Sequence, residues 1–260
     1  RQRRADIVAF NESSRVLKKG IALTPVKFGI SFTATHYNQA GALVHVYSDG
    51  SIALNHGGTE MGQGLNTKVA QVVADAFQVD FDRIKITKTT TEKVPNTSAT
   101  AASSGSDLNG MAALNAVEQI KGRLVAFAAE KWGVAPEDVR FLPNLVQVGT
   151  DTLTFDSFIK QAYMARVQLS AAGFYKTPDI HWDRASGKGR PFYYYAYGAA
   201  CSEVTIDTLS GEYRVTRTDI LHDVGRSLNP VLDKGQVEGA FIQGMGWLTT
   251  EELWWDDKGA

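Results

Sequence analysis

The stretch "GALVHVYSDGSIALNHGGTEMGQGLNTK", residues 41–68, carries the strongest fold signals in the chain. Apolar and polar residues alternate on both sides of Asp49–Gly50, and an Asp-Gly pair between two such runs predicts a β-hairpin. Glycines follow at positions 57, 58, 62 and 64, directly after the hairpin. At helical spacing beyond them stand Leu65, Val69, Val72, Val73 and Ala76. The stretch therefore predicts a hairpin, a glycine-rich loop and a helix in succession.

The glycine-rich loop lacks the residues of the common phosphate-binding motifs. A P-loop needs Gly-x-x-x-x-Gly-Lys-Ser/Thr, but Gly64 is followed by Leu65. A dinucleotide-binding loop needs a third glycine, and Thr67 stands in its place. What remains is a set of bare backbone N–H groups before a helix N-terminus, which suits an anion. A tight turn is the more common use of such glycines, so both interpretations stay open.

The rest of the chain mixes helices and strands without a regular βαβ alternation, which predicts an α+β fold. We expect a helix over residues 3–19 with Gly20 as its C-cap, followed by extended chain over 21–34. A long helix is expected after the loop that ends near residue 106, and a second hairpin around residues 210–211. Asn229–Pro230 suits the start of a last helix, with a strand at residues 254–255 and a turn after it.

Two further segments have the composition of ligand-binding loops. Residues 96–110, "NTSATAASSGSDLNG", are almost all small or polar, and loops of this length are often functional. Ser104 and Asp107 could instead form a capping box for the helix that follows. Residues 229–247 place Gln236 beside Gly235, so that its amide could reach into a site. Close helix packing explains the glycines of that segment equally well.

Composition excludes several classes of protein. The 260 residues are 43% apolar, enough for one large domain or two smaller ones, and the net charge of −1 gives no electrostatic footprint for nucleic acid. No run of eighteen apolar residues occurs, so no membrane association is expected. Cys201 is the single cysteine, which forbids an internal disulfide and indicates a reducing, cytoplasmic compartment.

The sequence contains no self-contained catalytic set. Histidines 36, 45, 56, 181 and 222 lack the spacing of metal ligands, and no Gly-x-Ser-x-Gly elbow occurs. No pair of carboxylates is placed for acid–base chemistry. From the residues alone, we predict binding of a sizeable anionic ligand, with no catalytic residue and no protein ligand to a metal.

Three segments together resemble the molybdopterin-binding subunit of the xanthine dehydrogenase family. They are "GGTEMGQGLNTK", "VPNTSATAASSGSDLNG" and "DVGRSLNPVLDKGQVEGAFIQGMGWLTTEEL", and "KKGIALTPVKFGISFT" is similar as well. The resemblance covers nearly the whole chain and implies mixed sheets with long packing helices. It implies a molybdenum hydroxylase that converts hypoxanthine and xanthine to urate, with electrons passing through [2Fe-2S] clusters and FAD on partner subunits or domains to NAD. The dithiolene of the pterin, not protein side chains, would hold the metal.

The same resemblance assigns residues to the site. The residues implied to contact the molybdopterin cofactor are Met61, Gly62, Gln63, Ala102, Ser103, Ser104, Gly105 and Gln236. Those implied to border the purine substrate are Phe32, Thr33, Ala101 and Ala102. Phe32 would face the flat purine ring, as an aromatic side chain suits a heterocycle, although a plain core role also fits it.

The sequence departs from the family pattern in its length. The Gly-Glu-Pro-Pro segment that carries the family's catalytic glutamate does not occur in residues 1–260. We therefore expect residues 1–260 to be a part of the molybdopterin-binding domain, cut at both ends and inactive alone. It is expected to assemble as a hetero-oligomer with an FAD and iron–sulfur subunit. The alternatives are an aldehyde oxidase, another heterocycle hydroxylase, or a scaffold of the same fold without the cofactor; NAD and oxygen both stay open as the electron acceptor.

Overall fold

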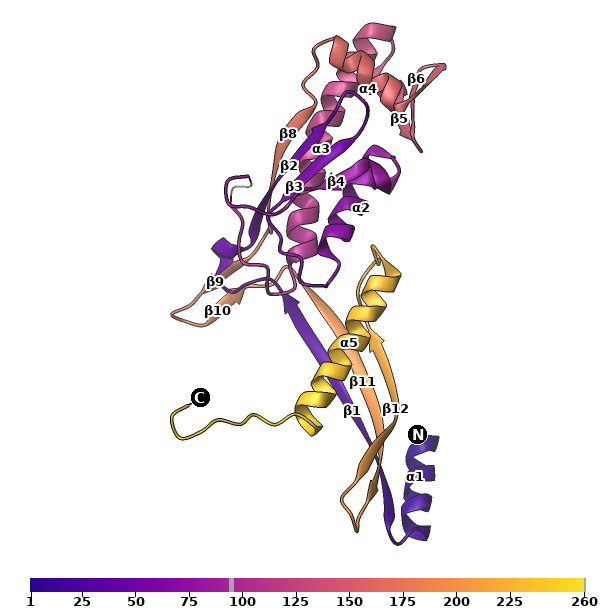
Figure 1. Ribbon diagram of the computed structural model, residues 1–260, viewed down its shortest axis with the longest axis vertical. Helices are drawn as coiled ribbons and strands as arrows, with labels where there is room; N and C mark the ends of the chain where they lie inside the picture. Colours follow the sequence, from indigo (N-terminus) through magenta and orange to yellow (C-terminus); the bar gives the residue numbers. More distant parts are fainter. Residues whose placement is uncertain (94–95, 260) are drawn as a thin grey trace. The chain divides into compact units, whose positions relative to one another are not determined.

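The computed structural model describes residues 1–93 and 96–259, and these form two compact units (Figure 1). The core unit comprises the described residues of 30–193 together with 228–236. The long-strand unit comprises residues 1–29, 194–227 and 237–259. Each unit is described by itself below. Both contain helices and strands, so the predicted α+β class is confirmed.

A four-stranded sheet organises the core unit. In sheet order its strands are β4 (Ile84–Ile86), β3 (Ile52–His56), β2 (Gln39–Val46) and β8 (Ser170–Lys176). Strands β2 and β3 pair antiparallel with Val46 opposite Ile52, so the hairpin predicted at Asp49–Gly50 is confirmed. Gly50 has a φ of +82°, the left-handed conformation that this tight turn requires. Strand β8 pairs antiparallel with β2, and β4 pairs parallel with β3.

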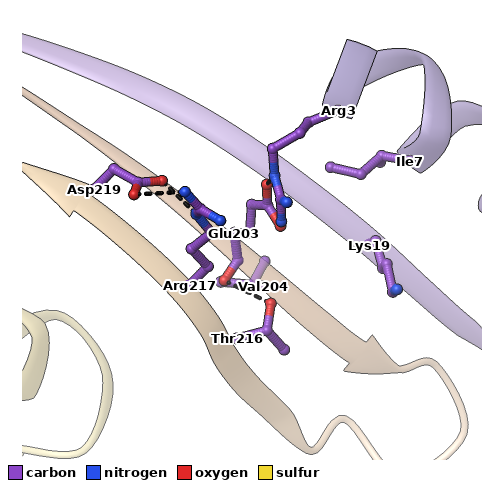
Figure 2. Close-up of a pocket in the computed structure, with 8 residues that line it drawn as sticks. All are labelled: Arg3, Ile7, Lys19, Glu203, Val204, Thr216, Arg217 and Asp219. Atoms are coloured by element: carbon purple, nitrogen blue, oxygen red, sulfur yellow. Dashed lines mark hydrogen bonds and ion pairs between the residues drawn. The ribbon is translucent and has the colours of Figure 1, made fainter.

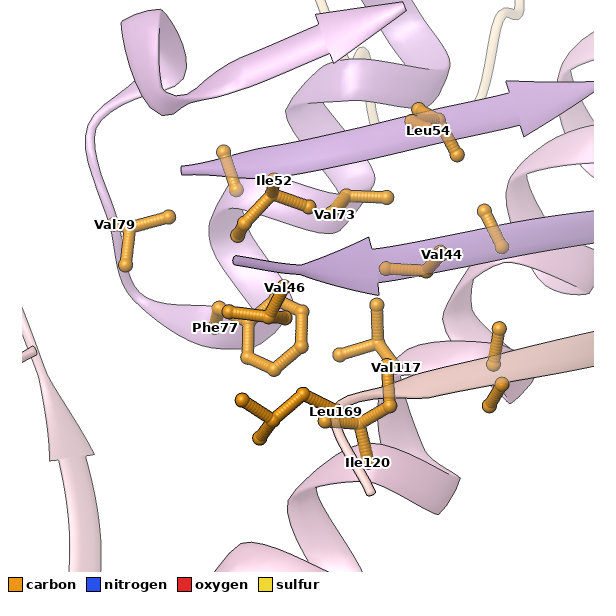
Figure 3. Packing of buried hydrophobic residues seen from close by; sticks show 14 of the residues in the cluster. Val44, Val46, Ile52, Leu54, Val73, Phe77, Val79, Val117, Ile120 and Leu169 are labelled. Carbon is orange, nitrogen blue, oxygen red and sulfur yellow. The ribbon is translucent and has the colours of Figure 1, made fainter. Parts of the chain in front are cut away.

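Two helices pack on this sheet and enclose the hydrophobic core (Figure 3). They are α2 (Leu65–Phe77) and α3 (Gly105–Trp132), the two helices predicted after the loops. Valine and leucine side chains of β2 and β3 meet Val73, Phe77 and Ile120 of the helices, all buried. Gly173 allows strand β8 to lie very close to helix α3, because a Cβ at this position would lie 2.0 Å from the carbonyl oxygen of Ala112 in α3. Apolar alternation in the strands and helical spacing in α2 thus explain the same core.

A smaller layer extends the core unit. An antiparallel three-stranded sheet precedes a helix, and its elements are β5 (Val139–Leu142), β6 (Leu145–Val148), β7 (Asp151–Thr154) and α4 (Phe155–Met164). Phe155 and Phe158 of α4 are fully buried and join the main core. A short hairpin, β9 (His181–Asp183) with β10 (Lys188–Arg190), completes the unit, together with single 3-10 turns at residues 35–37, 81–83 and 136–138.

The long-strand unit has a three-stranded sheet of order β1-β11-β12, helix α1 and the later part of helix α5. Its elements are α1 (Gln2–Ser13), β1 (Leu17–Ile30), β11 (Tyr194–Asp207), β12 (Tyr213–His222) and, from residue 237, α5 (Pro230–Thr249). The hairpin predicted around residues 210–211 is confirmed by the antiparallel pairing of β11 with β12. None of the described residues of this unit is fully buried.

Two local predictions at the ends of the chain are wrong. The first helix ends at Ser13, not residue 19, and Gly20 lies within β1 instead of capping a helix. The side chain of Asn11 explains why the helix ends before Lys19. Its amide accepts from the Lys19 N–H at 2.7 Å and donates to the Lys19 carbonyl at 2.9 Å, so that Lys19 is held in extended backbone. Trp254 and Trp255 are irregular instead of strand, although a turn does follow them.

Within the part of the chain that the structure describes, no helix combines the length and the apolar character needed to cross a membrane.

Candidate functional site

Three segments that are distant in the sequence line one pocket of about 400 Å³ in the core unit, here called the loop pocket. The first contains the glycine-rich loop and the start of α2, the second the loop before α3, and the third is the start of α5. The lining residues are Met61, Gln63, Leu65, Lys68, Thr100, Ala101, Ala102, Ser103, Gly105, Ser106 and Gln236. Seven of the eleven residues implied by the family resemblance are among them, while Gly62, Ser104, Phe32 and Thr33 are not.

Glu60 organises the glycine-rich loop. Its carboxylate accepts hydrogen bonds from the backbone N–H groups of Gly62 at 3.0 Å, Gly64 at 3.0 Å and Asn66 at 2.9 Å. Burial raises the pKa of Glu60, but these three hydrogen bonds outweigh it, so the pKa is lowered overall and the charged form is favoured. Three of the N–H groups that the sequence predicts to be bare here, those of Gly62, Gly64 and Asn66, are therefore already bonded to a carboxylate of the same loop.

Gln63 and Met61 are positioned by the same loop. The Gln63 amide accepts from the Met61 N–H at 2.6 Å and donates to the carbonyl of Thr59 at 2.8 Å. This side chain therefore lies along the pocket wall in a fixed orientation. Met61 is 67% exposed, so its thioether is accessible to a ligand.

Glycine is needed at positions 57 and 58 because Thr97 of the loop before α3 and Leu65 of α2 lie close to their backbone. A Cβ at Gly57 would lie 1.9 Å from the Thr97 hydroxyl, and one at Gly58 would lie 2.4 Å from Leu65. A hydrogen bond of 2.9 Å from the Thr59 N–H to the Thr100 hydroxyl joins the loops further. The glycine-rich loop and the loop before α3 thus form one wall of the pocket.

The loop before α3 carries an unusual backbone at the pocket. Ala102 and Ser103 both have φ of +55°, the left-handed region that non-glycine residues seldom adopt. Consecutive residues in this region store strain, and such strain concentrates at functional sites. Ser104 precedes α3 at the N-cap, but its hydroxyl donates to the carbonyl of Ala101 at 3.1 Å and forms no cap hydrogen bond. Ser104 therefore does not provide the cap that the alternative interpretation of this segment allowed.

Lys68 is a pocket residue that sequence analysis did not single out. Its ammonium pairs with the Asp233 carboxylate, and both side chains are only 15% exposed, so water screens this pair less than an ordinary surface pair. Asp233 lies one turn before Gln236 in α5. No local pattern could have identified the pair, because its members are 165 residues apart.

Phe32 and Thr33 do not line the loop pocket. They lie in the loop after β1, where the buried amide of Asn38 bonds both the N–H and the carbonyl of Phe32, each at 2.8 Å. The half-buried Phe32 ring packs edge-to-face against the Tyr37 ring, with 5.4 Å between the ring centroids, whereas Thr33 is exposed. The structure therefore fixes the backbone of Phe32 but does not bring it to the other predicted residues.

The buried His56 contacts the backbone of the glycine-rich loop. His56 ends β3, and its Nδ1 accepts from the Gly58 N–H at 3.2 Å. Burial lowers the pKa of His56, which favours the neutral imidazole. Within residues 1–93 and 96–259, no three His, Cys, Asp or Glu side chains are grouped so as to bind a metal ion.

A larger hollow of about 590 Å³, here called the charged hollow, lies in the long-strand unit (Figure 2). Arg3 pairs with Glu203, and Arg217 with Asp219, as Figure 2 shows. These partners raise the pKa values of both arginines and lower those of both carboxylates. Four of the five charged side chains that line this hollow thus pair with each other, Lys19 being the fifth, and the loop pocket is the better candidate for a ligand site.

Comparison with known proteins identifies relatives of the whole chain. A family model described as "Molybdopterin cofactor-binding domain" matches residues 1–260. Xanthine dehydrogenase from Oryza sativa subsp. japonica is 48% identical over 254 residues, which are 98% of this chain and 17% of that protein. Xanthine dehydrogenase from Dictyostelium discoideum is 49% identical over 97% of this chain and 17% of its own length. The chain thus spans about a sixth of the curated relatives that it matches.

Solved structures share the fold at lower sequence identity. Quinoline 2-oxidoreductase from Pseudomonas putida 86 has a TM-score of 0.80 at 22% identity, covering 99% of this chain and 33% of its own. A Cu,Mo-CO dehydrogenase has a TM-score of 0.81 at 22% identity, covering 100% of this chain and 33% of its own. At this level of identity the likeness concerns the fold alone.

Proposed function

We propose that this chain, which belongs to the molybdopterin cofactor-binding domain family, binds the cofactor in its loop pocket and acts as part of a xanthine dehydrogenase. The observation that carries the proposal is the convergence of three distant segments on one pocket. Each segment belongs to one of the three sequence motifs on which the family resemblance rests.

The side chains of the loop pocket suit a polar, anionic cofactor. Gln63, Gln236, Ser103 and Ser106 offer amide and hydroxyl groups, whereas the charge of Lys68 is already paired with Asp233. Gly105 and Ser106 lie in the first turn of α3, where backbone N–H groups have no partner within the helix and the dipole favours an anion. The volume of about 400 Å³ is within the range of cofactor sites.

In the proposed site, the residues of the chain bind and orient the cofactor. When bound, the molybdenum cofactor supplies the redox-active metal, which its own dithiolene holds. Gln63 and Gln236 would donate hydrogen bonds, and the small side chains of Ala102 and Ser103 would let the backbone approach closely. Ser104 and Gly62 would support the lining residues without lining the pocket themselves. Ser104 would do so through its hydrogen bond to Ala101.

For the substrate, we propose a purine bordered by Ala101 and Ala102 at the loop pocket and by Phe32 and Thr33. The exposed methyl group of Ala101 suits van der Waals contact with the edge of a flat ring. Because Phe32 and Thr33 do not line the pocket, this part of the proposal rests on the family resemblance and on the fixed backbone of Phe32.

The remaining parts of the proposed enzyme lie outside this chain. We propose an FAD and a [2Fe-2S] partner subunit or domain, NAD as the acceptor, and a cytoplasmic location, as expected from the single cysteine. Residues 1–260 would form part of the cofactor-binding domain, and the catalytic glutamate would lie in another segment of the enzyme.

A chimera tests the proposed function. Residues 1–260 replace the corresponding segment of the Dictyostelium discoideum xanthine dehydrogenase, and xanthine oxidation is measured with NAD and with oxygen. We expect urate production, no turnover by the isolated 260-residue chain, and loss of turnover in a Gln63→Ala, Gln236→Ala chimera. Oxidation of aldehydes or other heterocycles but not purines would favour a related hydroxylase. A chimera that contains no molybdenum would favour the scaffold and contradict the proposal.

A further inference from the structure

Gln236 reaches the loop pocket from a helix whose first two turns are attached to α2. Residues 228–236 cluster with the core unit, although α5 continues beyond them. The attachment involves one face of α2, formed by Gly64, Lys68 and Gln71 at positions i, i+4 and i+7. The opposite face of α2, which includes Val69, Val73 and Phe77, is buried in the core.

Three contacts join this face to the start of α5. Lys68 forms the shielded ion pair with Asp233. The Gln71 amide donates to the carbonyl of Leu228 at 3.1 Å and accepts from the Asn229 side chain at 3.1 Å. Gly64 makes room for Leu232, since a Cβ there would lie 2.5 Å from a Leu232 methyl group.

The contacts also fix the start of α5 itself. The Asn229 carboxamide oxygen accepts from the Leu232 N–H at 3.1 Å, which caps the helix at the residue predicted from the sequence. The same Asn229 side chain bonds Gln71, so cap and attachment depend on one residue. Asp233 and Gln236 are three residues apart and share a helix face. A lysine that anchors Asp233 therefore also sets the direction of Gln236.

We propose that Lys68 and Gln71 are positioning residues that hold Gln236 at the loop pocket through the start of α5, and so control binding of the cofactor. This inference rests on the proposed function for the identity of the ligand. The attachment itself can be tested without a ligand.

The test compares variants of residues 1–260 within the chimera described above, made in a host that synthesises molybdopterin. Lys68→Met keeps the length of the side chain and removes its charge; Lys68→Arg keeps the charge; a double variant, Lys68→Asp with Asp233→Lys, exchanges the partners. Lys160→Met, at an exposed position of α4, is the matched control. Gln71→Leu removes the second contact without altering the pocket lining.

Two readouts are measured, amide hydrogen exchange of residues 231–236 and pterin released per chain. We expect Lys68→Met to raise exchange and to lower the pterin content, each about tenfold, which corresponds to ~1.4 kcal/mol. Lys68→Arg and the exchanged pair should restore both within about twofold, and Gln71→Leu should give a smaller change of about threefold in both. Lys160→Met should match the unmodified chimera.

Three results would overturn the inference. One is unchanged exchange in both Lys68→Met and Gln71→Leu. Another is a loss of pterin in Lys68→Met without faster exchange, which would make Lys68 a direct ligand. The third is failure of both Lys68→Arg and the exchanged pair to restore exchange. If the unmodified chimera carries no pterin, the proposed function fails, but hydrogen exchange still decides whether the attachment positions Gln236.

Discussion

The two units of the molecule differ most in what they bury. The core unit encloses one continuous apolar cluster between its sheet and helices α2, α3 and α4 (Figure 3). The long-strand unit has equally regular elements, yet its described side chains remain at least partly exposed, with Leu221 at 79% and Trp254 at 78%. Regular secondary structure alone therefore does not fix a site.

The loop pocket and the charged hollow differ in the same way as the units that contain them. The loop pocket lies beside the packed core, and the loops that line it are fixed by Glu60, by glycine contacts and by the attachment of α5. The charged hollow is larger, but four of the five charged side chains in its lining are engaged in two ion pairs with each other. A pocket on a packed core can hold strained, preorganised backbone, which is what cofactor binding requires.

The largest expected effect comes from emptying the core. Phe158→Ala removes a fully buried ring that packs near Phe127 and Trp132, and it should lower the free energy of unfolding by about 3–5 kcal/mol. Urea unfolding followed by circular dichroism measures the loss. A change below about 1 kcal/mol would mean that the core unit is not the stable part of the molecule.

The strained loop should respond next. Ala102→Val places a β-branched side chain at a φ of +55° and should lower the free energy of unfolding by about 1–3 kcal/mol. Ala102→Gly tolerates that conformation and serves as the control, with stability close to that of the unmodified chain. Equal unfolding midpoints for the valine and glycine variants would show that the left-handed backbone is not retained in solution.

Glu60 gives a smaller effect with a defined pH dependence. Because its pKa is lowered in the folded chain, its contribution is complete above its usual value near 4.5 and fades as the pH falls through the lowered pKa. Glu60→Gln should cost about 0.5–2 kcal/mol at pH 7, the typical range for a helix N-terminal cap. Urea titrations at pH 7, 5 and 3.5 should show the two proteins converging at the acid end. A difference that stays constant with pH would rule out a role for the charge.

The smallest effect is expected in the long-strand unit. Leu221→Ser replaces a side chain that is 79% exposed and should change the free energy of unfolding by less than about 0.5 kcal/mol. The same urea assay measures it. A loss comparable with that of Phe158→Ala would remove the distinction between the two units.

Local patterns predicted most of the fold and part of the site. The Asp49–Gly50 hairpin, helix α2 and the Asn229 cap depend on residues close in sequence, and all three are confirmed. The end of α1 depends on Asn11 reaching Lys19, a side-chain contact that no periodicity encodes. The α+β class and the family were predictable because they rest on long stretches of the chain.

The errors at the site arise from contacts that only the folded chain creates. The glycines correctly marked a loop, but which N–H groups Glu60 would bind depends on how that loop closes. Lys68 remained unnoticed because Asp233 is far away in the sequence. A cap on α3 by Ser104 was one of two open interpretations, but its hydroxyl donates to Ala101 instead, directly after two residues with left-handed backbone.

The most direct test of the central claim measures pterin in two blocked variants. Ser106→Trp fills the loop pocket of the core unit, and Thr216→Trp fills the charged hollow of the long-strand unit, each from a lining position. Each substitution is made in the chimera described above and expressed in a molybdopterin-producing host, and the pterin released from each purified protein is quantified. We expect the unmodified chimera and Thr216→Trp to carry equal amounts and Ser106→Trp to carry about tenfold less. Undiminished pterin in Ser106→Trp, or a loss confined to Thr216→Trp, would contradict the assignment of the loop pocket as the cofactor site.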